Sequence, residues 1–442
     1  MSDKLESLKA EILKKVREYQ NTREAESKGF DRKNPKVPVS GKVFDEEDVA
    51  TLIDSSLDFW LTAGKFTDMF ESELAKLFGL RYALMTNSGS SANLIALSAL
   101  TSKFLGDSKL NDGDEVITAA ASFPTTVNPI FQCGLAPVFL DVELDTYNID
   151  TSKIEETITN KTKAIMIAHT LGNPFDVKKI TKICQDYNLF LIEDCCDALG
   201  SKFNGKMVGT FGDVSTMSFY PAHHITTGEG GAVFTDNPMI KRAAESIRDW
   251  GRDCWCKTGC DGTCGKRFDW KLGNLPHGYD HKYIYANVGY NLKATDMQAA
   301  IGCSQLKKLS NFIKIRKDNF EFYLKFFRKY NNFFILPKIY DGADMSPFGY
   351  LINIHSDAPF KRQELVRYLE SKGIATRMLF GGNLTKQPAY MDKKYRVIGG
   401  LENTDSLMNN AFWIGVYPGI NNEMREYVVE IFADFLENLD SN

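Results

Sequence analysis

Hydrophobic and polar positions follow two alternating patterns through the middle of this chain. Short runs in which almost every residue is apolar predict buried β-strands, and they lie at 82–86, 115–118, 137–141, 164–169, 189–193, 216–219 and 231–235. The stretches between these runs, such as 90–104 and 177–187, place apolar residues at the spacing of an α-helix. Buried strands separated by helices predict an α/β fold with a mostly parallel sheet.

The two ends of the chain show different patterns. Residues 1–28 combine apolar residues at helical spacing with many Lys and Glu, which predicts an amphipathic helix that packs on the body of the protein. The proline-containing segment 32–38 predicts a linker. Beyond one long helix expected at 297–326, a predicted strand at 350–355 and a predicted helix at 361–372 indicate a smaller α+β unit.

These patterns and the composition indicate a globular protein with two domains. The predicted parts of the 442 residues are a helical arm and linker at 1–40, a large α/β domain at 41–320 with a Cys-rich insert at 250–267, and a small C-terminal α+β domain at 321–442. A formal net charge of −4 without a basic block predicts no nucleic-acid partner. The N-terminal residues lack the apolar core of a secretory signal, and no apolar run reaches about 18 residues, so we expect a cytoplasmic protein without a membrane partner.

Residues that follow predicted strands are candidates for binding a cofactor. Gly89 and Ser90 lie where a strand turns into a helix, a place that binds phosphate through helix N–H groups or is simply capped. Asp194 ends an apolar strand, where a carboxylate either holds a protonated ring nitrogen of a ligand or caps the next helix. Phe123 also follows a strand, and its ring either stacks on a planar cofactor or belongs to the core.

Motifs further along the chain resemble one enzyme family. The motifs are the strings Ser218-Phe219-Tyr220-Pro221-Ala222-His223-His224, Gly228-Glu229-Gly230-Gly231, Gly289-Tyr290-Asn291-Leu292-Lys293 and Thr295-Asp296-Met297-Gln298-Ala299-Ala300. In this order, and with the strand ends described above, they resemble the vitamin B6-dependent sugar aminotransferases of the DegT type, from about residue 45 to the C-terminus. The resemblance implies the fold-type I architecture of PLP-dependent aminotransferases and a homodimer.

The resemblance also implies roles for individual residues. Asp194 matches the partner of the cofactor's pyridine nitrogen, and Phe123 matches the aromatic residue that stacks on the cofactor ring. Asn291 matches a residue that reaches the phosphate of the neighbouring subunit's cofactor. The residues that match phosphate ligands are Gly89, Ser90 and Ser218.

The family's catalytic lysine is absent, and its place in the motif is taken by His223. In the aminotransferases this lysine forms a Schiff base with the cofactor and then moves protons. An imidazole forms no such Schiff base, but it serves as a general base near neutral pH. We therefore predict that His223 is the catalytic base, with His224 as the alternative, and that the cofactor is pyridoxamine 5′-phosphate bound without a covalent link.

Cysteines form a second candidate site. Four of them, Cys254, Cys256, Cys260 and Cys264, lie within eleven residues, and Cys196 lies two residues after Asp194. Crowded cysteines in a reducing compartment indicate metal binding more often than disulfides. The four neighbours alone suit zinc by number, although the Cys-x-Cys spacing is short for a zinc site. Alternatively, Cys196 and three of the four bind an iron–sulfur cluster.

The His-for-Lys exchange, the cysteine string and the string His277-Gly278-Tyr279-Asp280-His281 resemble one branch of the family, the CDP-4-keto-6-deoxyglucose 3-dehydrases. The resemblance implies a [2Fe-2S] cluster whose ligands are Cys196, Cys254, Cys256 and Cys264. It implies that the enzyme removes the C3 hydroxyl of CDP-4-keto-6-deoxy-D-glucose during 3,6-dideoxyhexose synthesis for the lipopolysaccharide O-antigen. It also implies a separate NADH-dependent flavin iron–sulfur reductase as the electron donor.

Two further residues flank the predicted machinery. Tyr220 precedes His223 and Asp197 follows Asp194, and we predict that they favour elimination over transamination. The sequence leaves three alternatives: a TDP-4-keto-2,6-dideoxyhexose 3-dehydrase, a sugar aminotransferase, and a non-catalytic B6-binding regulator with a structural zinc. The absent lysine argues against the second alternative, and the intact Asp194, His223 and thiolate set argue against the third.

Overall fold

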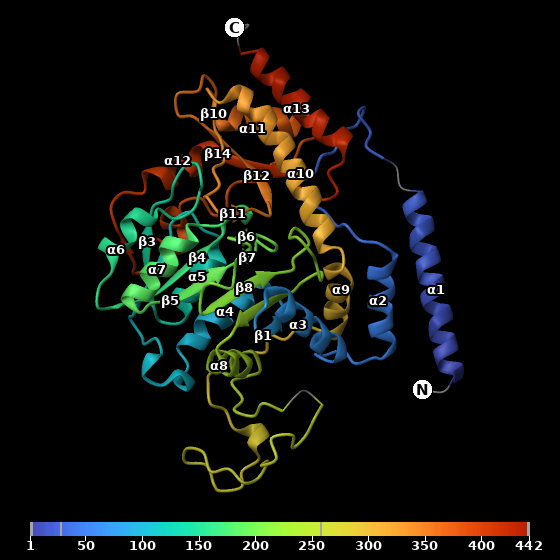
Figure 1. Cartoon of the computed structure of the whole chain (residues 1–442), viewed down its shortest axis with the longest axis vertical. Coiled ribbons are helices and arrows are strands. Elements are labelled where there is room, and N and C mark those ends of the chain that lie inside the picture. Colours follow the sequence, from blue (N-terminus) through green and yellow to red (C-terminus); the bar gives the residue numbers. More distant parts are fainter. Residues whose placement is uncertain (1–2, 27–28, 257–258, 440–442) are drawn as a thin grey trace.

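The computed structural model describes residues 3–26, 29–256 and 259–439, and in them one eight-stranded sheet runs through the larger domain (Figure 1). The strand order is β1-β9-β8-β5-β4-β2-β3-β13. The strands are β1 (Tyr82–Thr86), β2 (Glu115–Ala119), β3 (Ala136–Leu140), β4 (Thr162–Ala168), β5 (Phe190–Asp194), β8 (Val214–Ser218), β9 (Gly231–Thr235) and β13 (Arg396–Val397). Strand β9 is antiparallel to both of its neighbours and the other pairs are parallel, so the prediction of a mostly parallel sheet is confirmed.

Helices cover both faces of this sheet, which explains why its strands are apolar throughout. Ala164 and Met166 of β4 pack in a cluster with residues of α4 (Gly89–Leu100), α5 (Pro124–Gln132) and α8 (Pro238–Arg248). Ile165 and Ile167 of the same strand pack in another cluster, to which α7 (Val177–Tyr187) contributes. Successive residues of a strand point to opposite faces, so a strand buried on both sides is hydrophobic at every position.

The remaining elements of this domain pack around its edges. They are the helices α2 (Glu46–Leu57), α3 (Lys65–Phe78), α6 (Ile154–Thr157) and α9 (Asp296–Leu306), and the short strands β6 (Lys202–Phe203), β7 (Lys206–Met207) and β11 (Ala343–Asp344). Helices α3 and α9 bury Phe70, Leu74 and Ala299 in one cluster with residues of the edge strand β1 and of its neighbour β9.

The smaller domain is built on an antiparallel sheet with the order β10-β12-β14. Its elements are β10 (Phe334–Ile335), β12 (Gly349–Ile354), β14 (Ala411–Gly415), α10 (Leu309–Phe327), α11 (Arg362–Ser371), α12 (Glu402–Asn410) and α13 (Asn422–Glu437). The predicted strand and helix near 350 and 361 correspond to β12 and α11. The predicted domain boundary at 320 lies inside α10.

One long helix expected at 297–326 is instead two helices, α9 and α10, and that prediction is wrong. The break lies at Lys307 and Lys308, and the Lys308 ammonium forms ion pairs with Asp45 and Asp48 at the start of α2. Helix α9 and the first turn of α10 pack in the large domain, whereas the rest of α10 packs in the small one, so the break lets the chain change direction between the two cores.

The N-terminal helix α1 (Asp3–Ala25) lies beside α2 and apart from the sheet (Figure 1). Its Lys9 forms ion pairs with Asp54 and Asp58 on the α2 side. Leu5 and Ile12 stay half exposed, so the expected packing on the body is limited to α2. In the part of the chain that the structure describes, no helix combines the length and apolar character needed to span a bilayer.

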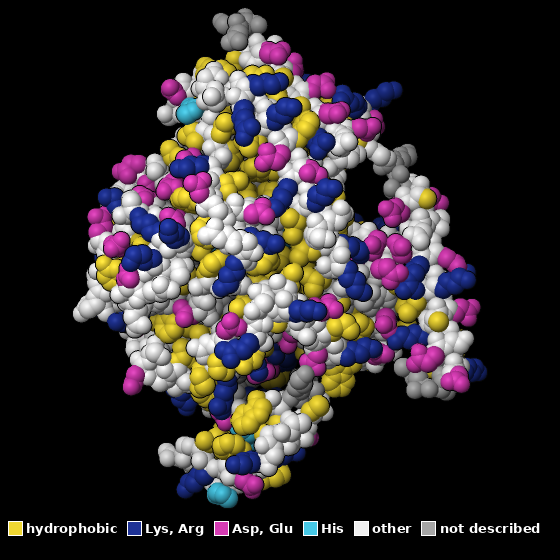
Figure 2. Space-filling model, in the orientation of Figure 1, with side chains coloured by type: hydrophobic (Ala, Val, Ile, Leu, Met, Phe, Trp, Pro, Cys, Tyr) yellow, Lys and Arg dark blue, Asp and Glu magenta, His cyan; other side chains and the backbone are white. Residues whose placement is uncertain are grey.

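The Cys-rich segment leaves the sheet after α8 and forms a lobe without strands in its described residues (Figures 1 and 2). It returns only at α9, so the excursion extends well beyond the predicted insert at 250–267. An isolated antiparallel β-bridge joins Arg252 and Tyr285 at the base of the lobe. Nε2 of the buried His281 lies 2.7 Å from a carboxylate oxygen of Asp253, within hydrogen-bond distance. Gly251 has a φ of +83°, and a Cβ there would lie 1.9 Å from the Asn287 carbonyl oxygen, so glycine is required.

Asp296 joins α9 to α3, and we expect its substitution to destabilise the large domain. Its carboxylate accepts hydrogen bonds from the backbone N–H groups of Gly64, Phe66 and Thr67 at the start of α3. In Asp296→Asn the charge is lost and one acceptor becomes a donor that faces these N–H groups. We expect the free energy of unfolding in urea to fall by about 2–3 kcal/mol.

The control for this prediction is Asp318→Asn, at an exposed position of α10. Its unfolding free energy should stay within about 0.5 kcal/mol of the parent protein. Equal stability of the two variants would contradict the role assigned to Asp296.

Candidate active site

A cavity of about 440 Å³ lies between the carboxyl ends of the central strands and the small domain. The carboxyl ends of parallel strands are the usual place for a ligand in α/β folds. The large domain contributes the ends of β4, β5 and β8 and the first turns of α4 and α5, and the small domain contributes Phe348, Arg377 and Trp413. The predicted site residues on its walls are Gly89, Ser90, Phe123, Asp194, Cys196, Asp197, Ser218, Tyr220 and His223.

The N-terminus of α4 forms one corner of this cavity. Ser88 caps the helix by accepting a hydrogen bond from the Ser91 N–H at 3.0 Å. A Cβ on Gly89 would lie 2.4 Å from the Ser218 Cβ and 3.1 Å from the Cys196 sulfur, so the close approach of α4 to β8 requires glycine. The predicted phosphate residues Gly89, Ser90 and Ser218 therefore meet at a helix N-terminus, where the helix dipole favours an anion.

Asp194 is buried at the end of β5 and is held by three donors. One carboxylate oxygen accepts from the Asn93 amide at 2.8 Å and from the Thr126 hydroxyl at 2.7 Å. The other accepts from the backbone N–H of Cys196 at 3.1 Å. A carboxylate held in this way stays oriented, and its second oxygen keeps a free lone pair for a ring N–H in the cavity.

Asn93 and Thr126 are functional residues that the sequence analysis missed. Asn93 also accepts a hydrogen bond from the Thr216 hydroxyl at 2.6 Å, so it links β8 to the Asp194 carboxylate. A signal was present in the sequence, because Asn93 is a polar residue in an otherwise apolar stretch of α4. Buried polar side chains need partners, and such a residue points to one nearby.

Phe123 caps α5 and turns its ring to the cavity, where 49% of the side chain is exposed. Phe380 contacts it edge to face with a centroid distance of 6.2 Å. One face of a half-exposed ring is open for a planar ligand, which is the arrangement needed for stacking. Tyr220, 51% exposed, lies on the wall of the same cavity.

His223 lies on the turn after β8, with its ring on the cavity wall. Its Nδ1 is 3.5 Å from an Asp197 carboxylate oxygen, and its ring centroid is 5.1 Å from that of Phe348. Burial, and then the positive charge of Arg316, lower the pKa of His223 to about 3. Burial raises the pKa of Asp197 to about 8. The imidazole is therefore uncharged at neutral pH and able to accept a proton.

His224 points away from the cavity. Its Nε2 lies 3.2 Å from the Ser346 carbonyl oxygen, and its side chain is buried. The structure thus places His223, rather than the alternative His224, against the space where a ligand would lie. Asn291 lies elsewhere, on the exposed return of the Cys-rich segment, where it accepts a hydrogen bond from Lys293 at 2.8 Å.

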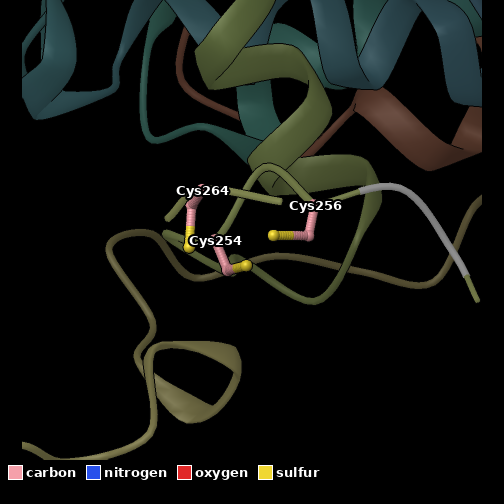
Figure 3. A group of neighbouring side chains, drawn as sticks. All are labelled: Cys254, Cys256 and Cys264. Atoms are coloured by element: carbon pink, nitrogen blue, oxygen red, sulfur yellow. The ribbon is translucent and has the colours of Figure 1, made fainter. Parts of the chain in front are cut away.

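The sulfur atoms of Cys254, Cys256 and Cys264 lie within 4.8 Å of one another and converge as Figure 3 shows. Burial raises the pKa of Cys254 to about 11. At Cys256 burial acts in the same direction, but hydrogen bonds from Thr263 and from the neighbouring thiols outweigh it and lower the pKa to about 7. Converging thiols of which one is readily ionised are suited to a soft metal group.

Cys196 does not join this group of three, and the predicted set of four ligands is only partly assembled. Cys196 lies on the wall of the 440 Å³ cavity described above, called the cofactor cavity below, and its backbone N–H donates a hydrogen bond to the Asp194 carboxylate. It is placed there by its position two residues after the end of β5, whereas the other three sit on the lobe beyond α8. Cys260 is exposed and lies on the wall of a second cavity together with Cys254 and Cys256.

Comparison with known proteins shows the same family over most of the chain. Residues 42–433 match the DegT/DnrJ/EryC1/StrS aminotransferase family. The lipopolysaccharide biosynthesis protein RfbH of Salmonella typhimurium is 53% identical over 430 residues, which are 97% of this chain and 98% of the relative. The dTDP-4-dehydro-2,6-dideoxy-D-glucose 3-dehydratase of Saccharopolyspora spinosa is 51% identical over 428 residues, which are 97% of this chain and 92% of the relative.

Solved structures agree with these sequence matches. The structure of E. coli GDP-4-keto-6-deoxy-D-mannose-3-dehydratase with bound hydrated PLP has a TM-score of 0.81 and 32% identity, and the match covers 90% of this chain and 99% of that one. The predicted fold-type I architecture and the predicted family are thereby confirmed. Because the family match and the two closely similar relatives span nearly the whole chain, this protein belongs to the DegT/DnrJ/EryC1/StrS aminotransferase family.

Proposed function

We propose that this protein is a pyridoxamine 5′-phosphate-dependent dehydrase that removes the C3 hydroxyl of CDP-4-keto-6-deoxy-D-glucose during 3,6-dideoxyhexose synthesis. The observation that carries the proposal is His223, an uncharged imidazole on the cofactor cavity at the position of the aminotransferase lysine. An enzyme without that lysine forms no internal Schiff base, so transamination gives way to proton abstraction and elimination. The similarity to RfbH, a lipopolysaccharide biosynthesis protein, supports the pathway.

An alternative candidate for the substrate is a dTDP-linked 4-keto-2,6-dideoxyhexose. The similarity to the Saccharopolyspora spinosa dTDP-4-dehydro-2,6-dideoxy-D-glucose 3-dehydratase, at 51% identity, favours it. The two substrates differ in the nucleotide and in the C2 hydroxyl, while the reacting C3 and C4 are alike. The same cavity residues would therefore serve either one.

The residues of the cavity fit the phosphorylated cofactor. Gly89, Ser90 and Ser218 would bind its phosphate at the N-terminus of α4, and Phe123 would stack on its ring. Asp194 would hold the ring nitrogen in its protonated form. When bound, pyridoxamine phosphate supplies an amine that condenses with the sugar ketone and a ring that accepts electrons.

The proton transfer is assigned to one nitrogen of His223. Nδ1 faces Asp197 at 3.5 Å, which leaves Nε2 to take a proton from the carbon that bears the cofactor amine. Asp197 faces Nδ1 of the imidazole, and Tyr220 lies on the wall of the same cavity. These two residues would favour elimination over transamination.

We further propose that a [2Fe-2S] cluster is bound by Cys196, Cys254, Cys256 and Cys264. A separate NADH-dependent flavin iron–sulfur reductase would supply the two electrons. The convergence of the last three thiols supports the metal group. Cys196, the fourth proposed ligand, does not join the other three thiols in this structure, because it lies on the wall of the cofactor cavity. We also propose a homodimer in which Asn291 of one subunit approaches the partner's cofactor.

The first prediction concerns the protein as purified without oxygen. We expect brown protein with about two irons and two sulfides per chain, and no protein-bound cofactor that borohydride fixes covalently. The measurements are absorption spectra before and after borohydride, together with iron, zinc and sulfide analysis. Colourless protein that contains zinc would contradict the proposed iron–sulfur cluster. A yellow chromophore that borohydride fixes to the protein would instead support a sugar aminotransferase.

The second prediction concerns restoration of the missing lysine. In His223→Lys we expect pyridoxal phosphate to form a Schiff base that borohydride fixes to residue 223, because the new amine lies on the cofactor cavity. Dehydrase activity should fall by more than about 100-fold because the base is lost. Peptide mass spectrometry locates the modification. The control, His277→Lys, adds a lysine at an exposed position and should remain unmodified.

The third prediction separates the two possible ligand sets for the metal. Cys254→Ser and Cys196→Ser should each lose iron and the visible absorption, whereas Cys260→Ser should keep both. The expected cause is the loss of one of four thiolates from the cluster. Iron retained in Cys196→Ser but lost in Cys260→Ser would place the site wholly within the lobe and refute the proposed ligand set.

A further inference from the structure

A buried arginine lies directly behind His223. Arg316 of α10 is only 1% exposed, and its guanidinium donates hydrogen bonds to backbone carbonyls rather than to a carboxylate. The acceptors are the carbonyl oxygens of Ala222 at 3.3 Å, His223 at 3.0 Å, Pro347 at 3.4 Å and Phe348 at 3.1 Å. A planar cation with fixed donor directions is well suited to hold several carbonyls at once.

These carbonyls belong to two different walls of the cofactor cavity. Ala222 and His223 form the turn after β8 in the large domain, whereas Phe348 precedes β12 of the small domain. The Phe348 ring lies 5.1 Å from the His223 ring and 5.9 Å from the Arg316 guanidinium. Arg316 therefore fixes the backbone of the turn that carries His223 and also the aromatic ring against which the imidazole packs.

The same cation affects the charge of the imidazole. Burial is the larger cause that lowers the pKa of His223, and the charge of Arg316 is the smaller one. The same two causes lower the pKa of His224. Burial lowers the pKa of Arg316 itself to about 9, so the guanidinium remains charged at neutral pH. The other titratable groups on the cavities that border His223 are Asp194, Cys196, Asp197, Tyr220, Arg377 and Tyr417.

We propose that Arg316 is a positioning residue for the base: through the backbone carbonyls of Ala222, His223 and Phe348 it holds the turn that carries His223 against the aromatic ring on which the imidazole packs. This inference rests on the proposed function, in which His223 is the base. It differs from a purely structural role, because a structural arginine would change stability without changing the protonation of His223 or the rate of proton abstraction.

Two substitutions separate the charge of Arg316 from its hydrogen bonds. Arg316→Gln removes the charge but keeps an amide donor for the carbonyls. Arg316→Lys keeps the charge but loses the planar fork, so fewer carbonyls are held in place. Leu324→Ala is the matched control, because Leu324 is buried on the same helix and packs in the core of the small domain.

The first readout needs no turnover. Protein labelled at its six histidines is titrated by NMR, and His223 is identified by the signal lost in His223→Gln. In the parent and in Arg316→Lys we expect His223 not to titrate between about pH 5 and pH 8. The titration therefore extends down to about pH 3, where a rise of more than about one unit in the pKa of His223 in Arg316→Gln becomes visible. Leu324→Ala should titrate like the parent.

The second readout is the rate of the loaded enzyme. Arg316→Gln should gain an acid limb in kcat/KM, because the imidazolium that accumulates at low pH cannot accept a proton. Arg316→Lys should lose about tenfold or more in kcat at every pH with little change in KM, because the base is displaced. If Arg316→Gln fails to fold, the test is whether kcat falls further in Arg316→Lys than in Leu324→Ala.

Two results would overturn the inference. One is a His223 titration in Arg316→Gln that equals that of the parent. The other is a rate for Arg316→Lys that falls no further than that of an equally destabilised Leu324→Ala. Dehydration that survives His223→Gln would instead refute the proposed base itself, so failure of the inference and failure of the proposed function give different results.

Discussion

The close approach of three chain segments around Asp194 determines the geometry of the site. Strand β5 ends in this carboxylate, α4 begins at Gly89, and β8 ends at Ser218, and a single added methyl group at Gly89 would collide with both Ser218 and Cys196. Asn93 then reaches from α4 to Asp194 and to Thr216 of β8. Asp194 and the N-terminus of α4 are thus fixed relative to each other by the packing of the sheet against α4.

The electrostatics of the cavity favour an uncharged side chain at position 223. A lysine must be uncharged to form a Schiff base, and a histidine must be uncharged to accept a proton. Burial and the Arg316 cation disfavour a second positive charge on the turn after β8, which is the condition that both reactions need. In the proposed dehydrase, histidine in place of lysine would therefore change the chemistry while the surrounding charges and burial stay suited to it.

The sequence predicted the sheet closely because its strands are buried on both faces and leave a continuous apolar signal, as in β1, β5 and β9. It did not predict the break between α9 and α10, since Lys307 and Lys308 fit a helical pattern and the partners of Lys308 lie far away in the chain. Gly89, Phe123 and Asp194 were predicted from their positions after strands, whereas Ser218 and His223 were predicted from the motifs that resemble the family. Arg316 was missed because its role depends on carbonyls from two domains, which no local pattern reveals.

The lobe beyond α8 poses a different physical problem from the rest of the protein. Its described residues form no strands, and its order comes from a few contacts, such as the bond between His281 and Asp253 and the stacking of Trp270 on His281. Three sulfur atoms within 4.8 Å of one another repel when they are ionised, so close packing of thiolates needs a bound cation. A metal bound as proposed would make metal binding and the folding of this lobe one process. A metal that also bonded Cys196 would tie this lobe to the wall of the cofactor cavity, and so would couple the position of the lobe to the state of the active site.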